Sequence, residues 1–142
     1  MIIYTLNFLL SILIGSMIFF MAIVSPSVFA TLSTNASSKF LRTIFPRMFL
    51  FGFIISIVSL IFTFISGNVL NSILLIIIAI SFIINRNYLT PKINNLRDRE
   101  LEGDEKASSS FKKMHFGSVL LFMLNFILLV SIIIINYFNY NL

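Results

Sequence analysis

The sequence is poor in charged residues and contains no cysteine. The absence of cysteine excludes disulfides and thiolate metal sites. Charged residues make up 11% of the 142 residues and hydrophobic residues 58%, whereas soluble domains carry about 25% and 45–50%. A soluble fold of this length could not bury that much apolar surface. We therefore expect the chain to be an integral membrane protein.

Basic residues are missing from the first 38 positions. A secretory signal peptide needs a basic segment before its apolar stretch and a small-residue cleavage site after it. Here the apolar run starts at Ile2 and continues to Val24, which is too long for such a peptide. We therefore expect this segment to remain in the protein as a helix.

Four long runs contain no charged residue: Ile2–Val24, Met48–Ile65, Val69–Ile84 and Phe116–Ile135. A helix of about 20 residues crosses the ~30 Å hydrocarbon core of a bilayer. With their polar flanks, the runs predict an all-α fold, an integral membrane four-helix bundle that forms a single domain over residues 1–142. The predicted helices are 2–24, 46–65, 69–88 and 112–136, with loops at 25–45 and 89–111 and a tight turn at 66–68.

All ten Lys and Arg residues lie in or beside the loops 25–45 and 89–111, and the opposite side has none. Basic residues mark the cytoplasmic side of a membrane protein. We therefore expect cytoplasmic loops, two helix hairpins of parallel orientation, and N and C termini outside. Heavy use of Ile, Phe and Asn is typical of an A/T-rich genome and favours a bacterial inner (plasma) membrane.

The formal net charge of +5 is explained by this orientation signal, with anionic lipid headgroups as counterions. We therefore predict the lipid bilayer, and no nucleic acid, as a partner. A homo-oligomer or a membrane-complex partner is left open.

The two predicted hairpins share a pattern, because the first helix of each ends in a hydroxyl–proline pair. These pairs are Ser25-Pro26 and Thr90-Pro91. An internal duplication would explain the pattern. We expect both prolines to end helices where the chain leaves the bilayer, and Pro46 to occupy the first turn of the second helix.

All five acidic residues lie between positions 98 and 105, interleaved with basic ones. This pattern predicts a short solvated helix that is broken at Gly103. A divalent-metal site is the alternative, since carboxylates are ligands for hard cations. The spacing matches no calcium loop, and we predict no metal site.

No ionisable residue falls near the centre of a predicted span, which argues against a proton pump or a voltage sensor. Polar residues do occur there, among them Ser56, Ser59, Ser81 and Asn125. We expect these side chains to hydrogen-bond between helices or to their own backbone.

Up-and-down packing would bring the four cytoplasmic helix ends to one level and gather polar residues at the mouth of the bundle. The candidate residues are Ser25, Arg47, Asn85, Tyr88, His115 and Ser118. One interpretation is a hydrogen-bonded clasp between helix ends, with Arg47 reaching phosphate headgroups. The other is a site where Arg47 and His115 meet an anionic or polar ligand near two helix N-termini.

Ligands for a metal or haem are scarce. His115 is the only histidine, which excludes bis-histidine haem within one chain. Haem ligation by His115 together with Met48 or Met114 is formally open. Met17 with Met21 could bind Cu(I), although methionine more often serves packing. No nucleophile–base pair, phosphate loop or carboxylate dyad is present. We predict no cofactor and no catalytic residue.

Four segments resemble the transmembrane protein 205-like family of small, largely uncharacterised four-helix membrane proteins. They are Val24–Leu32, Ile44–Phe49, Asn85–Pro91 and His115–Ser118. The chain departs from the family at Phe122, where the family tends to place an asparagine. The resemblance implies a membrane bundle without an established activity. More distantly, the architecture is similar to four-helix membrane proteins linked to copper resistance and haem synthesis. Those relatives suggest histidine within the bilayer, and the first predicted helix here has none.

Three functions follow as hypotheses. The first is small-molecule or lipid handling through the polar cluster at the mouth. The second is a structural or assembly subunit of a larger membrane complex, docked through the charged third loop. The third is a haem- or copper-linked membrane enzyme that uses His115. The first two are favoured, so we expect a protein that is not an enzyme.

Overall fold

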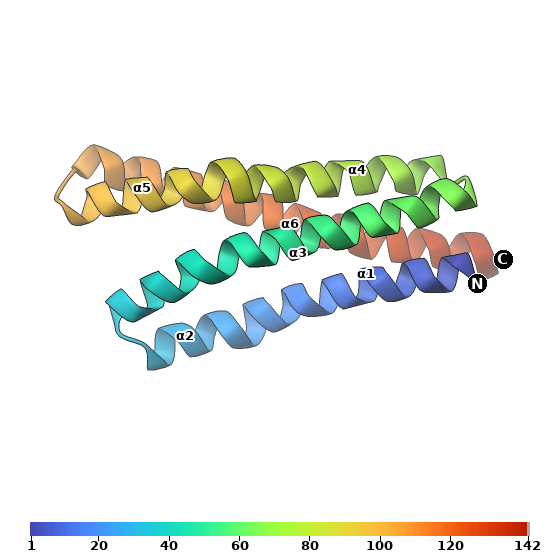
Figure 1. Ribbon diagram of the computed structural model, residues 1–142, viewed down its shortest axis with the longest axis horizontal. Helices are drawn as coiled ribbons and strands as arrows, with labels where there is room; N and C mark the ends of the chain where they lie inside the picture. Colours follow the sequence, from blue (N-terminus) through green and yellow to red (C-terminus); the bar gives the residue numbers. More distant parts are fainter. Residues whose placement is uncertain (142) are drawn as a thin grey trace.

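The computed structural model describes residues 1–141, and these are almost entirely helical. Four long helical segments run up and down as an antiparallel bundle (Figure 1). Each is long and apolar enough to cross a membrane, and no strand occurs in the part of the chain that the structure describes. The predicted all-α, four-helix architecture of two hairpins is therefore confirmed.

Two of the four segments are uninterrupted helices, and the other two each contain a turn of π-helix. The first segment consists of α1 (Ile2–Phe19), the π-helical turn η1 (Phe20–Val24) and α2 (Ser25–Thr31), and the second is α3 (Thr34–Ser66). The third consists of α4 (Val69–Ile84), the π-helical turn η2 (Asn85–Leu89) and α5 (Thr90–Leu101), and the fourth is α6 (Glu105–Asn141).

The predicted loops 25–45 and 89–111 are mostly helical, so this part of the prediction is wrong. The connections consist only of Leu32 with Ser33 and of residues 102–104. Hydropathy locates the point where apolar residues stop, but polar residues continue a helix readily. The break at Gly103 is confirmed, and its φ of +96° is one that glycine adopts easily. The bilayer boundaries along these helices stay a prediction.

The three prolines lie inside helical segments, which corrects the expectation that Pro26 and Pro91 end helices and that Pro46 begins one. Pro26 and Pro91 each lie two residues after the end of η1 or η2, and Pro46 lies within α3. Proline lacks an N–H and its ring crowds the carbonyl four residues back. A π-helical turn bonds five residues back instead, which changes the carbonyl that faces the ring. The helix can therefore continue past Pro26 and Pro91.

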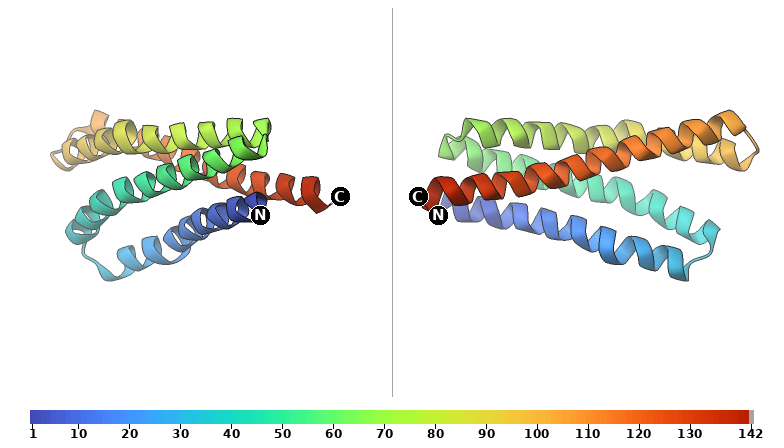
Figure 2. Two further views of the ribbon diagram at one scale, coloured as in Figure 1. Left: turned by 45° about the vertical axis from the view of Figure 1, so that its right-hand side comes forward. Right: turned by 180° about the vertical axis from the view of Figure 1, so that it is seen from behind.

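The two ends of the bundle differ in shape. The terminal end carries Met1, the turn at residues 66–68 and the last residues of α6, and there the segments lie close together (Figure 1). The loop end carries the two connections at residues 32–33 and 102–104. There, α2 and the start of α3 diverge from α5 and the start of α6, as both views of Figure 2 show.

The apolar core runs along the middle of the bundle and draws on all four segments. Its fully buried members from α1 are Leu6, Leu10, Leu13 and Met17, and they pack with Phe49, Leu75, Ile78, Phe82, Phe122, Leu129 and Ile132. Gly52 allows α3 to approach α4 closely, because a Cβ there would lie 2.6 Å from Cζ of Phe82.

Three asparagines join three segments at the terminal end, and two of them, Asn71 and Asn136, are buried. Asn136 of α6 donates from Nδ2 to Oδ1 of Asn7 at 2.7 Å and accepts on Oδ1 from Nδ2 of Asn71 at 2.6 Å. Nearby, the Ser72 hydroxyl lies 3.0 Å from that of Thr63 and links α4 to α3. Hydrogen bonds of this kind stabilise membrane helix pairs by about 0.6 kcal/mol each. Together they hold the two hairpins to one another.

Candidate functional site

The two π-helical turns occupy equivalent places in the two hairpins. η1 begins at residue 20 and precedes Ser25-Pro26, while η2 begins at residue 85 and precedes Thr90-Pro91. In both, the backbone N–H of the hydroxyl residue donates to the carbonyl five residues back. Thr90 also donates its hydroxyl to the Asn85 carbonyl at 2.7 Å. π-helical turns occur often at functional sites, because they redirect the side chains that follow.

Ser25 and Thr90 both line a cavity of about 560 Å³ at the loop end. The cavity lies between the two hairpins and receives side chains from every segment. Its polar lining residues are Ser25, Thr34, Ser37, Ser38, Arg42, Thr90, Asn94, Arg97, His115 and Ser118. Sites for small molecules have volumes of roughly 300–1,000 Å³ and combine apolar walls with a few polar groups.

Phenylalanine side chains form one wall of this cavity. The rings of Phe20 and Phe45 lie 5.2 Å apart, and those of Phe45 and Phe49 lie 5.9 Å apart. Phe49 also approaches Phe122 of α6 at 6.3 Å. These separations are typical of favourable aromatic pairs. Because Phe49 and Phe122 also belong to the core, the wall continues directly into the packed interior.

Ser118 and His115 of α6 line one side of the cavity. Ser118 donates its hydroxyl to Oδ1 of the buried Asn85 at 2.6 Å. The His115 ring stacks on Phe111 of the same helix, with ring centres 5.8 Å apart. Arg97 of α5 lies over the same Phe111 ring, with its guanidinium carbon 5.4 Å from the ring centre.

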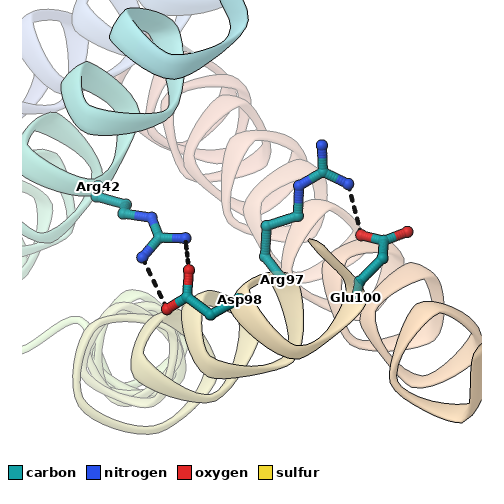
Figure 3. Close-up of polar contacts among 4 residues, drawn as sticks. All are labelled: Arg42, Arg97, Asp98 and Glu100. Carbon is teal, nitrogen blue, oxygen red and sulfur yellow. Dashed lines mark hydrogen bonds and ion pairs between the residues drawn. The ribbon is translucent and has the colours of Figure 1, made fainter. Parts of the chain in front are cut away.

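One ion pair crosses between the hairpins beside the cavity. Nη1 of Arg42 lies 3.0 Å from Oδ2 of Asp98, and Nη2 lies 2.5 Å from Oδ1, so the pair is bidentate (Figure 3). Both residues lie beyond the apolar runs, and the guanidinium lowers the pKa of the Asp98 carboxyl. Arg97 pairs with Glu100 of the same helix at 2.5 Å. The two arginines that line the cavity are therefore both neutralised by carboxylates.

A third ion pair stabilises the turn between α5 and α6. Arg99 pairs with Asp104 at 2.6 Å, and the backbone N–H of Ala107 donates to Oδ1 of Asp104 at 3.0 Å. The backbone hydrogen bond is the main reason why the pKa of Asp104 is lowered, followed by Arg99. The charged segment around Gly103 thus pairs many of its own charges.

The structure brings together four of the six predicted site residues. Ser25, His115 and Ser118 line the cavity, and Asn85 is bound to Ser118. The other two do not line it. Arg47 is exposed on α3, and Tyr88 is 56% exposed and lies near Lys92, whose Nζ is 3.4 Å from its hydroxyl.

Arg42 and Arg97 are cavity residues that the sequence reasoning missed, because their segments were expected to be loops. Arg42 lies three residues before Phe45, so a helix continued through this segment would have placed the two on nearly the same face. The acidic residues at 98–105 were a second signal, because they supply the carboxylates that pair with both arginines.

The chemistry of the cavity is that of binding by apolar contact and hydrogen bonding. Within residues 1–141, no three His, Asp or Glu side chains are grouped so that they could hold a metal ion. Met48 and Met21 share the cavity with His115, whereas Met17 is buried in the core.

Comparison with known proteins gives a family but no activity. No curated protein and no solved structure matches the chain significantly. The model of one family, described as a domain of unknown function (DUF4149), matches residues 8–102. This match covers the first three helical segments from residue 8 onward, with both π-helical turns, and ends before α6 with its His115 and Ser118. The chain is a multi-pass membrane protein that belongs to the DUF4149 family.

Proposed function

We propose that this protein binds a small amphipathic molecule, such as a single lipid or an apolar metabolite, in the cavity at the loop end. The observation that carries the proposal is the cavity itself, with about 560 Å³ of space between a phenylalanine wall and a polar lining. An apolar body gains from leaving water or headgroups for such a wall. A polar end can hydrogen-bond to the lining residues at the same time.

The lining favours a ligand whose polar end is uncharged. Ser25, His115 and Ser118 offer hydrogen-bonding groups. Arg42 and Arg97 already have carboxylate partners, so an anion entering the cavity would have to compete with Asp98 and Glu100. The charges of the lining therefore give little net attraction for an anion.

Native mass spectrometry of the gently solubilised protein tests the proposal. Met123 lines the cavity, whereas its neighbour Leu124 is exposed on the outside of α6. We expect the native protein and Leu124→Trp to carry the same bound mass, and Met123→Trp to lose it because the indole occupies the space. A native protein that arrives without any bound mass, or equal occupancy in both variants, would contradict the proposal.

Two alternatives receive less support. An assembly subunit would dock through the charged segment at residues 97–106, but Arg97 and Arg99 there are paired with carboxylates of the same segment. For a haem- or copper-linked enzyme, His115 and Met48 line the same cavity, but within residues 1–141 no three His, Asp or Glu side chains are grouped to hold a metal ion.

We also propose that the loop end faces the cytoplasm of a bacterial cell, since all Lys and Arg residues lie toward that end. The absence of cysteine makes a test simple. A cysteine at the exposed Ser109 should resist a membrane-impermeant thiol reagent in intact cells, and one at the exposed Tyr4 should react. The reverse pattern would overturn this orientation.

A relationship to the transmembrane protein 205-like family is a further proposal. The segments that carry the resemblance contribute Ser25, Phe29, His115 and Ser118 to the cavity lining. The shared residues would then belong to a shared binding site.

A further inference from the structure

A second hollow, of about 480 Å³, lies beside the first and has a different chemistry. It is lined by Pro46 of α3 and by Arg86, Asn87, Thr90, Pro91 and Asn94 of η2 and α5. Thr90 and Asn94 also line the first cavity, so the two spaces adjoin at these side chains. The second hollow contains no aromatic side chain and no carboxylate among its lining residues.

Arg86 is the charged group of this hollow, and its charge is not neutralised by an ion pair among the described residues. Its Nη1 donates to Oδ1 of Asn87 at 3.1 Å, which is a neutral partner. Its Nε is buried and has no hydrogen-bond partner within residues 1–141. In contrast, Arg42, Arg97 and Arg99 each pair with a carboxylate at 2.5–2.6 Å.

Arg86 lies in η2, close to the point where the apolar part of its helical segment ends. Asn85 directly follows the apolar run Val69–Ile84, so Arg86 lies where the chain passes from apolar to polar surroundings. The phosphates of membrane lipids lie at such a boundary. A buried N–H donor of a charged group is costly to leave without an acceptor. Arg86 therefore requires an anionic acceptor more than any of the three paired arginines does.

We propose that this second hollow binds a phosphate group, held by the guanidinium of Arg86 and by the side-chain amides of Asn87 and Asn94. Guanidinium groups bind phosphate in a bidentate manner with short, charge-assisted hydrogen bonds. At the boundary of the apolar run, the phosphate belongs to an anionic lipid headgroup. The site adjoins the first cavity at Asn94, but the proposal does not depend on the ligand proposed there.

Native mass spectrometry with added lipid tests the site. The purified protein is titrated with phosphatidylglycerol and, separately, with phosphatidylcholine. We expect the native protein to prefer phosphatidylglycerol and Arg86→Gln to bind it about tenfold more weakly, because one charge-assisted contact is lost. Arg99→Gln is the matched control, since it removes the same charge from a residue that is paired with Asp104. Arg86→Lys should keep part of the preference.

The outcomes separate the interpretations. If Arg86→Gln weakens phosphatidylglycerol binding no more than Arg99→Gln does, the proposed site is wrong. So would equal binding of the two lipids by the native protein. If Arg86→Gln does not fold, Asn87→Ala and Asn94→Ala, which keep the charge, must each weaken phosphatidylglycerol binding for the proposal to stand. Competition by inorganic phosphate at millimolar concentration would identify a soluble phosphate as the ligand, whereas its failure to compete would identify the lipid headgroup.

Discussion

The two ends of the bundle connect the same two hairpins by different means. At the terminal end, the hydrogen bond from Ser72 to Thr63 is buried and the one from Asn136 to Asn7 is partly buried. At the loop end, the bidentate pair of Arg42 with Asp98 crosses between the hairpins in an exposed position. Buried hydrogen bonds act at low dielectric, whereas exposed ion pairs are weakened by water and salt. We therefore expect the hairpins to be fixed at the terminal end and able to separate at the loop end.

The cavity proposed to bind a ligand lies at the loop end, where the ion pair between the hairpins is exposed. Its phenylalanine wall forms the limit between the two regions, because Phe49 belongs both to the cavity and to the core. Entry of a ligand would thus require movement of α2 and the start of α3 relative to α5, with little change in the terminal half.

The largest effect is expected where α3 and α4 approach most closely. In Gly52→Ala, the added Cβ would lie within 2.6 Å of the buried Phe82 ring, and we expect a loss of roughly 1–3 kcal/mol in the free energy of unfolding. The measurement is denaturation in detergent. Gly15→Ala is the control, because no atom lies within 4 Å of that Cβ. It should stabilise helix α1 slightly, by about 0.5 kcal/mol. Equal effects of both variants would refute the close packing at Gly52.

An intermediate effect is expected for the asparagines of the terminal half. Asn136→Leu removes two interhelical hydrogen bonds and should destabilise the protein by about 1 kcal/mol. Asn125 is equally buried, but its amide has no partner among the described residues. Asn125→Leu should therefore be neutral or stabilising, since it removes a buried polar group without breaking a bond. A greater loss of stability in Asn125→Leu than in Asn136→Leu would contradict the proposed role of the asparagine pairs.

The smallest effect on stability is expected for Arg42→Gln at the loop end. The pair that it breaks is exposed, so the unfolding midpoint should change less than in Asn136→Leu. The pH dependence has a definite sign. Because the pKa of Asp98 is lowered in the folded protein, its contribution is present above the unfolded value of about 3.9 and disappears as the pH falls through the lower folded value. Arg42→Gln should remove that acid sensitivity, and its persistence would assign it to another group.

The sequence was sufficient to predict four helices, because runs of about 20 apolar residues have one common explanation in a membrane protein. It also predicted that Asn85 and Ser118 lie at one level, since up-and-down packing aligns helix ends. It did not reveal the π-helical turns. An extra residue in a helical turn leaves no mark in composition, yet it rotates every side chain that follows.

This rotation explains part of the error in the predicted site. Tyr88 lies within η2, so a regular helical phase could not give its direction, and it is exposed and does not line the cavity. The asparagines at positions 7 and 71 could have been found from the sequence. Each is a strong hydrogen-bonding group in an otherwise apolar run, at similar distances from the terminal end, which is the pattern of an interhelical contact.

A pair of distance measurements with spin labels tests the contrast between the ends most directly. Labels on cysteines introduced at the exposed positions Asn35 and Ser109 report the loop end, and labels at Tyr4 and Val69 report the terminal end. We predict a broad distance distribution at the loop end that widens further in Arg42→Gln, and a narrow one at the terminal end that does not change. Equally narrow distributions at both ends, unaffected by Arg42→Gln, would contradict a bundle that opens at one end.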